Sequence, residues 1–164
     1  LAAQTLSLRA AKALLATDAH TRLVLLERIS NLRLNFNQQL QLIDYAVDIC
    51  TIENTRAAAL FEEDRFASIL EDPKANLPQK GKRVLELLRA RRHPSLTGAE
   101  HIFQTRVARL RLPQGVAIKH PPFFEDPCYR LEIAFRNGRA LMEKLKALYE
   151  LEGLLKIGDP WAED

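Results

Sequence analysis

The sequence is poor in the residues on which disulfide frameworks and thiolate metal sites depend. Its 164 residues include two cysteines, one methionine and one tryptophan. Cys50 and Cys128 stand in unrelated contexts, which favours a reducing compartment and no disulfide. No apolar run approaches the roughly eighteen residues of a membrane-spanning helix, and no secretory signal pattern opens the chain, so we expect a cytoplasmic protein without a membrane partner.

Motifs for catalysis and for metal or cofactor binding are also missing. The histidines lack the spacing of metal ligands; they are His20, His93, His101 and His120. The glycines are isolated, so no glycine-rich loop cradles a phosphate, and no GxSxG turn holds a nucleophile. Asp44 and Asp48 share a helix face, which a solvated acidic surface explains. The sequence predicts no metal, no cofactor and no enzyme, with a small enzyme assembled across a dimer as an alternative.

Positive charge is concentrated in the middle of the chain. Residues 1–72 carry seven Lys/Arg and ten Asp/Glu, whereas residues 73–120 carry eleven Lys/Arg and two Asp/Glu. Residues 121–164 are again acidic, with six Lys/Arg and nine Asp/Glu. A block this basic repels itself, and an anionic partner explains it better than chance. The open alternative is a basic face that pairs only with the acidic flanks of the same chain.

The hydrophobic pattern predicts a mainly α (α+β) protein in three parts. These are a helical bundle over residues 1–72, a basic helix pair over 73–114 and a β-β-α unit over 115–164. Apolar residues at helical spacing predict the helices, and Asn35 with Gln38 or Asn76 with Gln79 reads as a capping box. Thr97 with Glu100 predicts a third capping box, after a five-residue turn that begins at His93-Pro94.

The basic helix pair is the candidate DNA-binding region. Its predicted contacts are Lys80, Lys82, Arg83, Arg89, Arg91, Arg92, Arg106 and Arg109. The second helix opens with Gly98, Ala99 and Glu100, which are poor in groups that read base edges. We therefore expect contacts to the DNA backbone. The rival interpretation is a protein-interaction module whose basic face docks an acidic partner protein.

Residues 115–155 are the only stretch with strand periodicity. Val116 and Ile118 alternate with more polar neighbours, and a second alternating run follows at Leu131. Asn137 is a candidate N-cap for a leucine-rich helix. Such a unit can pack within one chain or against a second copy, because its strand edges are open and its leucine stripe is wide. The predicted dimerisation residues are Leu131, Ile133, Phe135, Leu141, Leu145 and Leu148.

Several of these segments resemble the C-terminal region of ParB-type partition proteins. The resemblance rests on residues 122–125, residues 129–135 and the helix from Leu141 to Leu151. Residues 6–15 are similar to the helix that follows the DNA-reading helix-turn-helix of that family. The resemblance implies a homodimer formed by two strands and a helix, a role in chromosome or plasmid partition, and a partner ATPase.

The family's nucleotide site has no counterpart in this sequence. ParB-type proteins bind CTP through a Gly-Glu-Arg-Arg motif, whereas Ala90-Arg91-Arg92 lacks the preceding glycine and acid. We therefore carry no CTP binding over to this chain. The chain begins with Leu1, so we expect a fragment of a longer protein. The expected function is a self-associating, DNA-binding partition-type protein.

Overall fold

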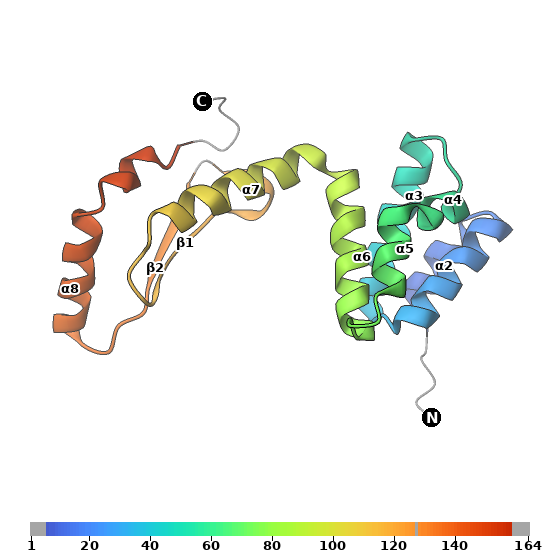
Figure 1. Ribbon diagram of the computed structural model, residues 1–164, viewed down its shortest axis with the longest axis horizontal. Coiled ribbons are helices and arrows are strands. Elements are labelled where there is room, and N and C mark those ends of the chain that lie inside the picture. Colours follow the sequence, from blue (N-terminus) through green and yellow to red (C-terminus); the bar gives the residue numbers. More distant parts are fainter. Residues whose placement is uncertain (1–5, 127, 159–164) are drawn as a thin grey trace. The chain divides into compact units, whose positions relative to one another are not determined.

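The computed structural model describes residues 6–126 and 128–158, and within them it is mainly helical (Figure 1). This part of the chain has eight α-helices, the last of which follows a C-terminal two-stranded hairpin. This confirms the predicted fold class. Internal contacts divide the chain into two compact units, Leu1–Pro94 and Ser95–Asp164. The division falls within the stretch that sequence analysis grouped as a basic helix pair.

The first unit is a bundle of six helices. They are α1 (Leu8–Leu15), α2 (Ala19–Leu32), α3 (Phe36–Ile52), α4 (Ala57–Glu62), α5 (Asp64–Glu71) and α6 (Leu77–Arg92). Helix α3 packs against α1, α2, α4 and α6, and α5 packs against α6. The core joins apolar side chains of all six helices, with Leu42, Leu60, Phe66 and Leu88 fully buried. Burial of these side chains is the main stabilising contribution to the bundle.

Local signals set the ends of several helices in this unit. Asn35 and Gln38 form the predicted capping box at the start of α3. Asn76 and Gln79 form the predicted capping box at the start of α6. In each box the asparagine side chain accepts from the backbone N–H of the glutamine, and the glutamine side chain accepts from the backbone N–H of the asparagine. These two predictions from sequence are confirmed.

The connection between α6 and α7 differs from the prediction. A single residue, His93, separates α6 from α7 (Pro94–Arg109), where sequence analysis expected a five-residue turn. Proline is favourable in the first turn of a helix because its missing N–H has no partner there anyway. Helix α7 therefore begins at Pro94, and Thr97 lies inside it. The capping box predicted at Thr97 is wrong, and the buried Thr97 hydroxyl has no hydrogen-bond partner among the described residues.

The second unit combines most of α7 with the hairpin and the last helix. After α7 come β1 (Val116–Lys119), the 3-10 turn η1 (Pro122–Phe124), β2 (Arg130–Ile133), α8 (Gly138–Tyr149) and the 3-10 helix η2 (Glu152–Lys156). Asn137 caps α8 as predicted, accepting from the backbone N–H of Ala140 at 2.9 Å. The strand predicted around Leu131 ends at Ile133, so Phe135 lies beyond it.

An aromatic cluster joins α7 to the hairpin. The ring of Phe103, which is 5% exposed, lies 5.0 Å from His120, 5.9 Å from Phe124 and 5.2 Å from Tyr129. The His120 and Phe124 rings stack at 4.1 Å. The Tyr129 hydroxyl donates to the carbonyl of Gly158 at 3.0 Å and ties the segment after η2 to the same cluster. This cluster supplies a small core for the second unit.

Candidate nucleic-acid and self-association surfaces

Arg91, near the end of α6, is held by two carboxylates of the first unit. Its guanidinium donates to Glu63 at 2.7 and 2.8 Å, to Oε1 of Glu53 at 2.7 Å, and to the second oxygen of Glu53. The hydrogen bond from Arg91 lowers the pKa of Glu53. Desolvation alone would raise the pKa of Glu63, but Arg91 and Arg65 outweigh it and lower that pKa. Arg91 therefore joins α6 to the ends of α3 and α4.

Arg92 is also engaged within the bundle. Its guanidinium pairs with Asp48 of α3 and contacts the ring of His93. Burial, reinforced by the charges of Arg92 and Arg89, lowers the pKa of His93 and favours its neutral form. Arg91 and Arg92 thus meet acidic residues of the N-terminal segment, which is the intramolecular pairing that sequence analysis left open. These ion pairs give both arginines partners within their own chain, and their contact with DNA phosphates stays a prediction.

The N-terminal half of α6 has two cationic side chains that are exposed to solvent, whereas the arginines near its C-terminal end are partly buried. The Lys82 side chain is 74% exposed and lies 3.6 Å from Glu86, one turn further along. Arg83 is 53% exposed and pairs with Asp72 at 2.8 Å. Lys80 donates to the carbonyl of Leu70 at 2.5 Å and is partly buried. Lys82 and Arg83 are the α6 cations most accessible to an anionic partner, because exposed ion pairs are weak and readily exchanged.

In the second unit, Arg106 and Arg109 of α7 line a cavity of about 620 Å³. The other described residues that line it are Leu110, Gly153, Lys156 and Ile157. Lys156 belongs to η2 and was not predicted as a site residue, because nothing in the sequence pattern links it to α7. Arg106 and Arg109 were predicted as DNA contacts, and the structure places them in the lining of one cavity together with Lys156.

The hairpin has one polar and one apolar face. Val116 pairs with Ile133 and Ile118 with Leu131, which places these four side chains on the same face. The opposite face carries Lys119 and Glu132, whose charged groups lie 2.6 Å apart. Val116 is buried but Leu131 is 50% exposed, and Phe135 just beyond the strand is 53% exposed. The apolar face is therefore only partly covered within the chain.

Helix α8 carries two neighbouring stripes with different surroundings. Leu141, Lys144 and Leu148 share the stripe that meets the rest of the unit, and Leu148 is 5% exposed. The Lys144 ammonium donates to the carbonyls of Gln114 at 2.5 Å and Ala134 at 2.7 Å, at the base of the hairpin. Leu148 was predicted to lie in a dimer interface, but its own chain already buries it.

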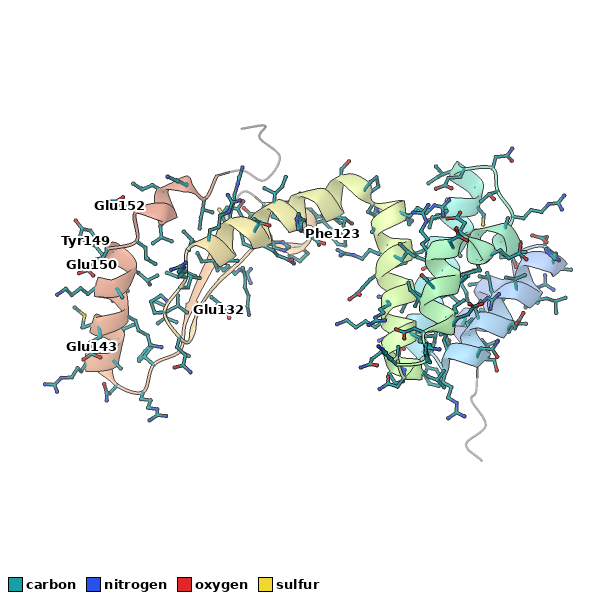
Figure 2. All side chains as sticks on the ribbon, in the orientation of Figure 1. Phe123, Glu132, Glu143, Tyr149, Glu150 and Glu152 are labelled. Carbon is teal, nitrogen blue, oxygen red and sulfur yellow. The ribbon has the colours of Figure 1, made fainter. Side chains whose placement is uncertain are left out.

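The second stripe of α8 is apolar and exposed. Met142, Leu145 and Tyr149 follow each other at three- and four-residue spacing and are 65%, 41% and 93% exposed. Figure 2 shows Tyr149 with Glu150 at the C-terminal end of α8 and Glu152 at the start of η2. Leu145 was predicted as a dimerisation residue, whereas Met142 and Tyr149 belong to the same wide stripe of the helix and were not in that set.

The described residues hold no cluster of three or more His, Cys, Asp or Glu side chains that could bind a metal ion. Burial raises the pKa of the half-buried Cys50 thiol, which makes it a poor nucleophile. A hydrogen bond with Asp126 likewise raises the pKa of Cys128. Within the described ranges, no helix is long and apolar enough to cross a membrane.

Comparison with known proteins returned no match: no protein-family model, curated protein or solved structure is significantly similar to this chain. The surfaces described above are therefore the basis for a functional proposal.

Proposed function

We propose that this chain is a self-associating DNA-binding protein. In this proposal the second unit forms a homodimer, and exposed cationic side chains contact the DNA backbone. The observation that carries the proposal is the exposed apolar surface of the second unit, defined by Leu131, Phe135, Met142, Leu145 and Tyr149. A role in partition, with a partner ATPase, rests on the sequence resemblance alone.

The exposed stripe of α8 favours a protein partner over solvent. Full burial of a leucine, methionine or phenylalanine side chain contributes about 1.5–3 kcal/mol. A two-fold interface buries each contributing side chain twice, once from each copy. Three such side chains follow one another at helical spacing on α8, and Leu131 and Phe135 expose further apolar surface in the same unit. A second copy offers the same stripe and the same open strand edges.

Sedimentation of the whole chain at micromolar concentration tests self-association. We expect a dimer for the unchanged chain and a monomer with unchanged circular dichroism for the variant Met142→Lys/Leu145→Lys. A matched control replaces two exposed leucines of the first unit, Leu15→Lys/Leu23→Lys, which are 69% and 67% exposed. This control should remain a dimer. A monomeric unchanged chain would contradict the proposed homodimer.

Contact with DNA is supported by the cations that the bundle leaves exposed. Lys82 and Arg83 protrude from α6, and Lys74 lies just before it in an exposed position. Arg109 is exposed on α7. None of these side chains is buried in the core, and each can reach a phosphate without disrupting the fold.

The salt dependence of duplex binding distinguishes DNA from an acidic protein partner. Binding to B-DNA loses affinity with a log–log slope of about −0.9 for each phosphate contacted. The variant Lys82→Gln/Arg83→Gln should weaken binding to all duplexes alike and flatten this slope by up to about two units. Replacement of Arg139 and Lys146, two exposed cations of α8, by glutamine is the charge-matched control. If the chain shifts the mobility of no duplex in a gel assay at low salt, the protein-interaction alternative is favoured.

A further inference from the structure

A cavity of about 530 Å³ lies in the first unit, between the turn that joins α1 to α2 and the end of α3. Ala16, Val47 and Cys50 line it with apolar surface. Burial raises the pKa of the Cys50 thiol, so this side chain is neutral and adds no charge to the cavity. A cavity of this volume, with apolar surface and a few polar groups, is typical of small-molecule sites.

Two side chains of opposite charge line this cavity, and no ion pair joins them. Arg56, at the start of α4, is exposed, and its guanidinium has no partner among the described residues. Asp18 caps α2, and one of its carboxylate oxygens accepts from the backbone N–H groups of His20 and Thr21, both at 3.0 Å. The Thr21 hydroxyl, together with these backbone bonds, lowers the pKa of Asp18 and keeps it charged. A carboxylate has about four acceptor positions, so Asp18 can accept further hydrogen bonds from a ligand.

Two threonine hydroxyls of the lining have already donated their hydrogens within the chain. Thr17 donates to the carbonyl of Leu14 at 2.8 Å, and Thr51 donates to that of Val47 at 2.8 Å. A hydroxyl has one hydrogen and two lone pairs, so both oxygens can still accept a hydrogen bond from a ligand. Together with the Asp18 carboxylate they favour a ligand group that is a donor, such as an ammonium.

We infer that this cavity binds a free amino acid with an aliphatic side chain. The ligand carboxylate accepts from the Arg56 guanidinium, whose planar pairs of donors match carboxylate oxygens, and from the His20 imidazole, which lines the same cavity. The ligand ammonium donates to Asp18 and to the threonine oxygens, and the aliphatic side chain packs against Ala16 and Val47. A ligand with only one of these charges uses only part of the lining and should bind more weakly. The inference does not depend on the proposed self-association or DNA binding.

Amide NMR of the whole nitrogen-labelled chain, titrated separately with L-valine and L-leucine up to about 10 mM, tests the site. Saturable shifts should be confined to residues 16–21 and 47–56. Two analogues of leucine each lack one charge: isocaproate has no amino group, and isoamylamine has no carboxylate. Each analogue should bind at least about tenfold more weakly than leucine, because one charged group of the lining gains no partner.

Two substitutions test the charged groups separately. Arg56→Gln should weaken leucine binding by at least about tenfold and abolish the preference for leucine over isoamylamine. Asp18→Asn keeps a residue that caps helices well, so α2 is retained, and it should abolish the preference for leucine over isocaproate. The control Arg9→Gln removes an exposed arginine of α1 that lies outside the lining, and it should bind leucine as the unchanged chain does.

Absence of saturable shifts with both valine and leucine overturns the inference and leaves this cavity as a hydrated surface of the bundle. Equal binding of leucine and its two analogues also overturns it, because the two charges of the ligand are then not recognised. Leucine binding that survives both Arg56→Gln and Asp18→Asn without loss contradicts the assigned contacts. Sedimentation and duplex binding are measured on other surfaces, so their outcome does not affect this test.

Discussion

Arg91 offers the sharpest test of how the central positive charge is used. The change Arg91→Gln keeps much of the side-chain length but removes the charge and most of the donors. It leaves Glu53 and Glu63 without the cation that lies between them. If Arg91 has a structural role, the variant should lose stability and keep its affinity for DNA.

The magnitude follows from the contacts and their exposure. The Arg91 side chain is 14% exposed, whereas those of Glu53 and Glu63 are 35% and 29% exposed. A hydrogen bond to a charged group contributes about 1.5–3 kcal/mol when shielded, and an exposed pair contributes about 0–1 kcal/mol. Two partly exposed partners place the expected loss at about 1.5–3 kcal/mol in the free energy of unfolding of the first unit. A double-mutant cycle with Glu53→Gln should show coupling between the two residues.

Urea denaturation followed by circular dichroism measures this loss, and hydrogen exchange of peptides from α3 and α6 assigns it to the first unit. Lys82→Gln is the control, because its side chain is 74% exposed and its pair with Glu86 is long. That change should stay within about 0.5 kcal/mol of the unchanged chain. A variant Arg91→Gln with an unchanged urea midpoint and weaker duplex binding would refute the structural role of Arg91 and support the predicted DNA contact.

Three further predictions concern the first unit. The folded chain holds the pKa values of Glu53 and Glu63 below the ordinary glutamate value, so their contribution to stability is present above the pKa of the unfolded chain and is lost as the pH falls through the lower folded pKa. Acid unfolding monitored by circular dichroism should show this loss, and Arg91→Gln should reduce it. Gln39→Leu should lower the free energy of unfolding by about 1–3 kcal/mol, because the buried Gln39 amide accepts from the backbone of Ser7 and donates to that of Leu34, both at 3.0 Å. An unchanged urea midpoint would contradict this prediction. Gly81→Val should also lower it by about 1–3 kcal/mol, since a β-carbon there would lie 2.8 Å from the buried Leu34 side chain. Gly98→Val should be milder in the same assay, because no atom lies within 4 Å of a β-carbon at that position.

Helix limits set by neighbouring residues were predictable from the sequence. The boxes at Asn35 and Asn76 and the cap at Asn137 each depend on residues three positions apart, so the pattern contains the whole interaction. Thr97 and Glu100 have the same spacing as these caps, but α7 begins three residues before Thr97, at Pro94. Competition between two acceptable starts is decided by packing, which a local pattern does not contain.

The partners of charged side chains were not predictable in the same way. Arg91 meets Glu53 and Glu63, which lie 38 and 28 positions earlier in the chain. The charge pattern favoured an anionic partner and left pairing with the acidic flanks open as the alternative. Lys156 was missed for the same reason, because only the folded second unit brings η2 to α7. Tertiary contacts of this range must be seen in the structure.

One variant tests self-association and DNA binding together, because it adds positive charge and removes the dimer, and these two changes have opposite effects on DNA affinity. The variant Met142→Lys/Leu145→Lys adds two positive charges to each chain. Electrostatics alone predicts tighter binding to DNA, because each added cation favours contact with the phosphate backbone. Loss of the dimer predicts weaker binding, because two linked copies engage one duplex with an avidity that a monomer lacks.

We expect the loss of avidity to prevail and to weaken duplex binding by at least about tenfold, since linkage of two sites can raise affinity by about 10²–10⁴. The control Leu15→Lys/Leu23→Lys adds the same charge to the first unit and should bind DNA as tightly as the unchanged chain or more tightly. Fluorescence anisotropy with a duplex long enough for both copies measures the two variants side by side. Equal affinities for the variant and the control would show that the dimer surface and the DNA contacts act independently, and would contradict the linked function.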